Sequence, residues 1–261
     1  MDKATLGVAV PPTLAGEVVV DCLGRHYREV NHELRGLVEQ GVESLRLINV
    51  AGQRYLGTNL QRPVRITIEG VPGNDLGAFM DGPRIQVLGD AQDGCGNTMN
   101  SGVLAIHGSA GDIIGHSMRG GSIYIRDNVG YRVGIHMKEY GAAQPVIVIG
   151  GTAQHFLGEY MAGGVLIVLG RRLPLDREHP SRYIGAGMHG GVIYIAGKVN
   201  EAFLGKEVGM LPLSDADRAV LQKHVGEYAR AFGLEAEPLL ARPFAKLYPK
   251  TVRPYGRLYA Y

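Results

Sequence analysis

The sequence is poor in the residues that build metal centres and disulfide frameworks. It has two cysteines, Cys22 and Cys95, and no second cysteine stands near either one. This spacing excludes a cysteine-based iron–sulfur or zinc motif. No two histidines have the His-x-x-x-His spacing of a helical metal site. We therefore expect reduced thiols, no metal and no cofactor in this chain.

The sequence also has little net charge and no long apolar run. Charged residues make up 20% of the chain and the formal net charge is +2, which is too weak a field to collect nucleic acid or acidic membrane. No segment reaches the roughly 18 apolar residues of a membrane span, and residues 1–10 lack a signal-peptide pattern. We expect a cytoplasmic protein with neither nucleic acid nor membrane as a partner.

Glycine is abundant and recurs at fixed intervals. It accounts for 39 of the 261 residues, about twice its ordinary share of roughly 7%. Successive phasing glycines are separated by 20, 19, 19, 19, 24, 27 and 20 residues, from Gly57 to Gly205. A fixed period of this length indicates a repeat architecture. Six of the eight methionines follow a phasing glycine by three residues: Gly77 with Met80, Gly96 with Met99, Gly115 with Met118, Gly134 with Met137, Gly158 with Met161 and Gly185 with Met188.

Each repeat also contains a short strand pattern. A second glycine is followed by alternating apolar residues, as in Gly121, Ile123 and Ile125. Period-two alternation is typical of a strand, and one such strand cannot bury its apolar face alone. The units must therefore stack, and a repeat of 19–20 residues is long enough for a parallel crossover. This predicts an all-β solenoid, a right-handed parallel β-helix of about seven coils, with the methionines in its core.

The two long spacings mark insertions into the repeat. One insertion covers residues 138–144, and the other covers residues 171–183 and contains Arg171, Arg172 and Arg177. Insertions map to surface loops, where partners or ligands bind. We take the three arginines as candidate partner-interface residues. The alternative is a self-sufficient enzyme whose cleft lies beside segment 171–183.

The ends of the chain differ from the repeat. Apolar residues at helical spacing predict a helix over residues 27–40, and a second helix begins at Ser214, whose capping-box partner is Asp217, and ends at Gly233. The domains are therefore an N-terminal cap (1–44), the glycine-repeat β-helix (45–210) and a C-terminal helix with an extended arm (211–261).

Four prolines characterise segment 234–261, from Pro238 to Pro254. Because proline donates no backbone hydrogen bond, we expect this arm to lie over a surface rather than add a strand to the rod. Tyrosine and arginine are common interface anchors, although the rings could equally pack on the chain's own coils. The candidate interface residues of the arm are Arg242, Arg253, Tyr255 and Arg257.

No segment has the pattern of a catalytic or cofactor site. Gly185, Gly187 and Gly190 match the dinucleotide fingerprint G-x-G-x-x-G, but a strand pattern follows them where the fingerprint requires a helix. The histidines of the coils have different offsets from the phasing glycine and form no ladder. We therefore assign no catalytic, cofactor-binding or metal-binding residue.

The repeats resemble a known family. Gly115-x-x-Met118-x-Gly-Gly121-x-Ile-x-Ile125 and the segments Gly134-Ile-His-Met-Lys138 and Leu157-Gly-Glu-Tyr-Met-Ala-Gly-Gly164 are similar to the G-x-G-x-G repeat domain at the C-terminus of the glutamate synthase large subunit. The resemblance covers residues 45–210. The tail around Pro243 and Pro249 looks like the ending of stand-alone versions of that domain. Related domains occur in the subunit of formylmethanofuran dehydrogenase that shares these coils, in the related formyltransferase/hydrolase complex and in N-methylglutamate synthase.

The resemblance implies a scaffold rather than an enzyme. In that family a glutaminase region and an FMN-bearing synthase region carry out the chemistry, and the β-helix lies between them. It implies that this chain is a scaffolding subunit of an oxidoreductase complex in nitrogen metabolism and amino-acid biosynthesis. Its partners would be a glutaminase-like chain and an FMN synthase-like chain, with FMN and the iron–sulfur cluster on those partners. No catalytic residue of the family has a counterpart here.

Overall fold

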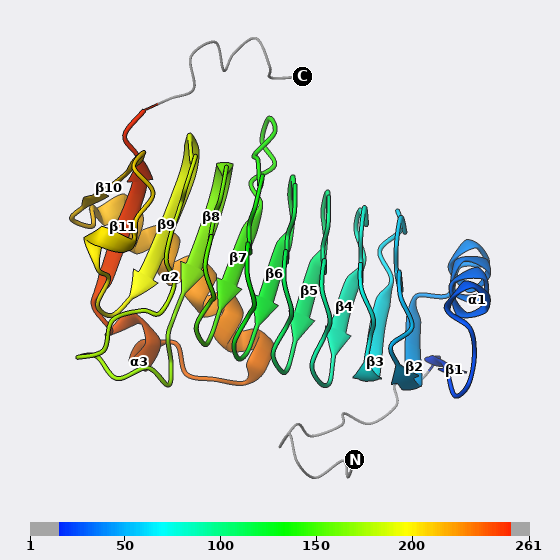
Figure 1. The fold of residues 1–261 in the computed structure, drawn as a ribbon. Helices are drawn as coiled ribbons and strands as arrows, with labels where there is room; N and C mark the ends of the chain where they lie inside the picture. Colours follow the sequence, from blue (N-terminus) through cyan, green and yellow to red (C-terminus); the bar gives the residue numbers. More distant parts are fainter. Residues whose placement is uncertain (1–15, 252–261) are drawn as a thin grey trace.

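The computed structural model describes residues 16–251, and these form one continuous sheet of 11 strands. Nine strands lie side by side in sequence order and pair in parallel, as Figure 1 shows. The strands are β1 (Val18–Asp21), β2 (Ser44–Ala51), β3 (Arg65–Val71), β4 (Arg84–Val87), β5 (Val103–Ile106), β6 (Ser122–Ile125), β7 (Val146–Ile149), β8 (Ala162–Val168) and β9 (Gly190–Ala196). The predicted parallel β-solenoid is confirmed, with about six turns, and the exact count of about seven coils stays a prediction. Its predicted hand stays a prediction.

One core runs through the centre of the solenoid. Alternate residues of each strand point inward, so that Ile123 and Ile125 of β6 stack on Leu104 and Ile106 of β5. The methionines of the repeat lie in the same core and are at most 1% exposed. Every coil therefore buries its apolar side against the coils before and after it, which is why a single repeat could not fold alone.

The phasing glycines occupy turns with an unusual backbone. In the turn around Gly158, Phe156 (φ 64°), Gly158 (φ 67°) and Tyr160 (φ 53°) are all left-handed. The amides then alternate in direction: that of Gly158 donates to Val133 of the preceding coil, and those of Phe156 and Tyr160 donate to the following coil. The same alternation of three left-handed residues recurs in other coils, at Tyr55, Gly57 and Asn59; Asp75, Gly77 and Phe79; Gly94, Gly96 and Thr98; Ile113, Gly115 and Ser117; and Arg132, Gly134 and His136.

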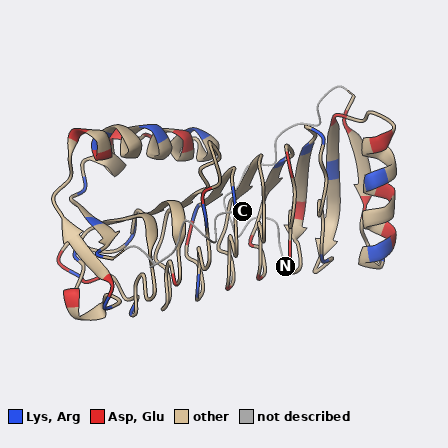
Figure 2. Cartoon of the chain, turned by 90° about the horizontal axis from the view of Figure 1, so that it is seen from above, with Lys and Arg blue, Asp and Glu red and all other residues tan. Residues whose placement is uncertain are grey.

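The outer face of the sheet changes character along the rod. At the N-terminal strands its side chains are polar, for example Thr67 and Gln86, whereas at β7 and β8 they are the buried Val148 and Ile167. Helix α2 (Asp215–Phe232) covers this apolar half, and the N-terminal half has no helix over it in the described chain (Figure 2). A second, smaller core forms between α2 and the sheet.

Two helices flank the coils. Helix α1 (Tyr27–Glu39) closes the N-terminal end of the rod through Val30 and Leu34, which join the main core. Helix α2 begins with a reciprocal capping box between Ser214 and Asp217 and ends at the left-handed Gly233. A 3₁₀ turn (Glu201–Phe203) and a short helix, α3 (Glu237–Leu240), complete the described helical segments. None of these helices is long and apolar enough to span a bilayer.

The expectation that the proline-rich arm adds no strand is wrong. Strand β11 (Phe244–Pro249) enters the sheet antiparallel to both β9 and β10 (Val208–Leu211). The prolines do not prevent this, because Pro243 precedes the strand and Pro249 is its last residue, which leaves the amides between them able to pair. Residues 252–261 lie outside the described part of the chain.

The turn geometry generates a first prediction. A Cβ at Gly158 would lie 2.6 Å from Cδ1 of Ile193, whereas one at Gly141, which is also left-handed, would meet nothing within 4 Å. Gly141→Ala therefore isolates the backbone cost of about 1–2 kcal/mol. We expect Gly158→Ala to lower the free energy of unfolding by a further 1–3 kcal/mol, roughly, through overpacking. Urea denaturation of both variants tests this, and equal losses would contradict it.

The position of β11 generates a second prediction. Deleting every residue after Ala241 removes the strand between β9 and β10 together with Lys246, whose Nζ lies 2.8 Å from the Asp217 carboxylate on α2. The truncated chain should melt many degrees below the full chain and lose part of its β-sheet circular dichroism. A chain truncated only after Thr251 is the matched control. An unchanged melting temperature after the longer deletion would show that β11 does not support the sheet.

Candidate functional site

The structure separates the candidate interface arginines. Arg171 and Arg172 line a pocket, and Arg177 lies exposed on the same insertion. Arg242 is half-buried, and its Nη2 donates to the carbonyls of Gly170 and Leu173, so it anchors the start of the insertion from within. Arg253, Tyr255 and Arg257 lie outside the described residues.

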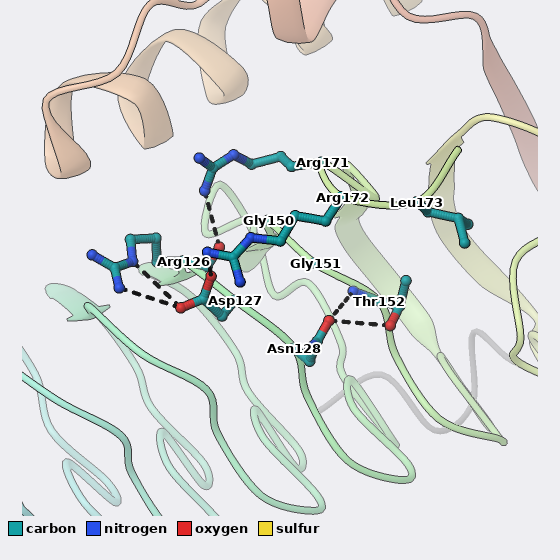
Figure 3. A pocket seen from close by; sticks show the side chains of 9 residues that line it. All are labelled: Arg126, Asp127, Asn128, Gly150, Gly151, Thr152, Arg171, Arg172 and Leu173. Atoms are coloured by element: carbon teal, nitrogen blue, oxygen red, sulfur yellow. Dashed lines mark hydrogen bonds and ion pairs between the residues drawn. The ribbon is translucent and has the colours of Figure 1, made fainter. Parts of the chain in front are cut away.

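The pocket forms where three loops meet. Arg126, Asp127 and Asn128 follow β6; Gly150, Gly151 and Thr152 follow β7; and Arg171, Arg172 and Leu173 come shortly after β8. Because these strands are parallel neighbours, their C-terminal ends lie side by side and bring the loops together. The cavity measures about 180 Å³. Figure 3 shows the arginine side chains gathered around Asp127.

Arginine charge dominates this pocket. Nη2 of Arg126 and Nη2 of Arg172 lie 3.4 and 3.5 Å from the Asp127 carboxylate oxygens. Arg171 donates through Nη1 to the carbonyl of Arg126 at 3.3 Å, and the Tyr228 hydroxyl donates to the same oxygen at 3.2 Å. The lining therefore holds three guanidinium groups and one carboxylate. These groups suit the binding of an anion. The Thr152 hydroxyl donates a hydrogen bond to Asn128 Oδ1 and has no catalytic base beside it among the described lining residues.

A second surface feature is two pairs of exposed aromatic side chains on the glycine turns, separated along the rod by the turns of Gly96, Gly115 and Gly134. Tyr55 and Tyr183 lie two residues before a phasing glycine, and Phe79 and Tyr160 lie two residues after one. All four are left-handed non-glycine residues, and their side chains are 38–55% exposed. We call these four residues the aromatic edge. The repeat alone did not reveal it, because only the central glycine of each turn is nearly invariant in the sequence.

Neighbouring rings and cations support the aromatic edge. Tyr160 stacks on His136 with a centroid distance of 5.3 Å, and Tyr183 stacks on Phe156 at 4.9 Å. The Arg132 guanidinium lies 4.7 Å from the centre of the Phe156 ring. Aromatic rings on adjacent coils thus hold one another at the surface, at positions where the backbone itself is disfavoured for these residue types.

The buried ionisable groups have structural surroundings. Asp217 accepts hydrogen bonds from Tyr194 (2.6 Å) and Lys246 (2.8 Å). Although burial raises the pKa of Asp217, the hydrogen bonds from Lys246, Ser214 and Tyr194 outweigh it and hold the pKa well below the ordinary range. Burial raises the pKa of the Cys95 thiol to about 12 and that of Cys22 to about 11, so both thiols are protonated at neutral pH. Within residues 16–251, no three His, Cys, Asp or Glu side chains are grouped as metal ligands.

Comparison with known proteins identifies the family. A family model described as the GXGXG motif matches residues 42–253. The chain belongs to the GXGXG motif family. Two turns of this chain have glycine at two alternating left-handed positions, Gly94 with Gly96 and Gly185 with Gly187.

Two relatives of very different size match this chain. An uncharacterised protein of Methanocaldococcus jannaschii is 45% identical over 255 residues, which are 93% of this chain and 96% of that protein. The ferredoxin-dependent glutamate synthase 2 of Synechocystis is 30% identical over 164 residues, which are 60% of this chain and 10% of that enzyme. The chain is therefore a GXGXG domain of the glutamate synthase type, as the repeats indicate.

His179 anchors the 171–183 insertion and gives a third prediction. Its ring is 1% exposed, and backbone amides of Ala153 and Ser181 face its two nitrogens at 3.4 and 3.3 Å. Burial lowers its pKa to about 4, from an ordinary value of 6.5. Because the unfolded chain then binds the proton first, stability falls as the pH drops from about 6.5 towards 4.

The wild type should lose free energy of unfolding between pH 7 and pH 5, and we expect this loss to be about 2 kcal/mol smaller in His179→Gln. Urea denaturation at both pH values measures it, and His189→Gln in a coil turn is the matched control. If the wild type and His179→Gln lose the same free energy over this range, the ring is not held neutral by burial.

Proposed function

We propose that this chain is a non-catalytic scaffolding subunit of a glutamate synthase-type complex, which joins a glutaminase chain to an FMN synthase chain. The observation that carries the proposal is the aromatic edge on a domain of this family. Exposed Tyr and Phe side chains are typical of protein interfaces, where such anchors contribute much of the binding energy. FMN and the iron–sulfur cluster belong to the partner chains in this proposal.

Backbone strain supports the interpretation of the edge. A left-handed tyrosine or phenylalanine costs roughly 1–2 kcal/mol relative to glycine at the same position, and Tyr55, Phe79, Tyr160 and Tyr183 all adopt this conformation. The turn imposes this conformation and pairs its amides with adjacent coils, so the aromatic side chains project from a fixed backbone. A rigid rod also suits a scaffold, because its stacked coils hold the two pairs of edge residues at a fixed separation.

The fourth prediction tests the scaffold and its surface together. The tagged full chain should co-purify from its own organism with a flavoprotein and a glutaminase chain. Tyr160→Asn combined with Tyr183→Asn should reduce recovery of both partners about tenfold or more, as expected when interface anchors are lost. Asparagine tolerates the left-handed conformation, so circular dichroism and melting temperature should stay within a few degrees of the wild type.

Leu23→Asn is the matched control, because Leu23 is 74% exposed and lies outside the glycine turns. It should retain both partners. Recovery of a molybdenum or tungsten subunit or an amidohydrolase would instead support membership of a complex of the formylmethanofuran dehydrogenase type. A chain that purifies alone would favour the self-sufficient enzyme, and full recovery of both partners by the double variant would contradict docking on the aromatic edge.

A further inference from the structure

The arginine pocket has the composition of a ligand site rather than of a structural ion pair. Charge-assisted hydrogen bonds between arginine and carboxylate are typically 2.7–2.9 Å long, whereas both guanidinium contacts to Asp127 are 3.4 Å or longer. Asp127 is the one carboxylate among the described residues that line the cavity, beside three arginines. The described lining is therefore rich in cations, and its carboxylate makes only long contacts with them.

The floor of the pocket is kept clear of side chains. Gly150 and Gly151 form it, and a Cβ on Gly150 would collide with the Tyr228 hydroxyl and the Arg126 carbonyl oxygen. A Cβ on Gly151 would collide with the Asn128 side chain and approach the Asp127 carbonyl at 2.8 Å. Close packing against these atoms leaves room only for glycine at either position, so neither residue adds a side chain to the lining of the cavity.

Arg171 and Arg172 can both present a guanidinium group to the cavity. Arg171 reaches back from the insertion, and its Nη1 is held by the same Arg126 carbonyl oxygen that accepts from Tyr228. Arg172, beside it, is 81% exposed and can turn towards an incoming anion without breaking a buried contact. Figure 3 shows both side chains extending over Asp127.

We propose that this pocket binds a small dianionic ligand through a phosphate or dicarboxylate group. Guanidinium groups are planar donors that match both kinds of oxyanion in pairs. Arg171 and Arg172 would each bind one charge of a dianion, and Asp127 would reduce its affinity by repulsion. The site is separate from the aromatic edge, so a ligand could bind here whether or not a partner chain is docked.

Isothermal titration of the purified full chain at low ionic strength tests the proposal, with inorganic phosphate and succinate as separate probes and acetate as the monoanion control. Arg171→Gln and Arg172→Gln should each weaken binding of the dianion about tenfold, as expected for loss of a charged hydrogen bond. Asp127→Asn should tighten binding about fivefold, because it removes a like charge. Arg177→Gln, on the same insertion but outside the pocket, should leave binding unchanged.

The outcomes separate the possible ligands. Binding of phosphate alone assigns a phosphate-bearing ligand, and binding of succinate alone assigns a dicarboxylate. The thermal shift produced by the bound dianion at a fixed concentration should be smaller in Arg172→Gln, whose exposed side chain is not needed for folding. Absence of binding by both dianions at millimolar concentration would overturn the proposal. Equal weakening by Arg177→Gln, or no tightening by Asp127→Asn, would also overturn it.

Discussion

The structure depends on the space inside each glycine turn. At the phasing glycines from Gly57 to Gly185 the backbone is left-handed, and at most of them the place where a Cβ would project is already filled by the side chain of a neighbouring strand, such as Ile193 at Gly158. The absence of a side chain at this point lets the chain turn tightly enough for its amides to pair with the coils on both sides. The parallel sheet and the continuous core both follow from this turn.

Much of the fold could be predicted because its signals are local and repeated. The spacing of the phasing glycines, the buried methionines and the capping box at Ser214 each depend on residues a few positions apart. The two outer left-handed positions could not be predicted in the same way. Tyrosine and phenylalanine do not favour the left-handed conformation, so Tyr160 and Phe156 give no sign of it in the sequence. The stacking of adjacent coils imposes it on them.

Long-range pairing explains the other differences. The four prolines of segment 234–261 argue against a strand, yet the two that bound β11 lie where a missing amide does no harm. The arginine pocket combines residues of three loops that are distant in the sequence, and only two of its three arginines were singled out from the sequence. Arg126 gave no signal of its own, because its role depends on β6, β7 and β8 lying side by side.

Helix α2 limits how the solenoid can change in length. The Tyr194 hydroxyl of β9 donates to Asp217, and the Tyr124 hydroxyl of β6 donates to Glu227. The helix is therefore attached to two strands that are three positions apart in the sheet. Ten helical residues rise about 15 Å, and three strand spacings measure about 14 Å. The length of the helix between these two contacts therefore matches the width of the sheet that it crosses. Whole coils can be gained or lost in evolution on the N-terminal side, but beneath α2 their number is fixed by the length of the helix that crosses them.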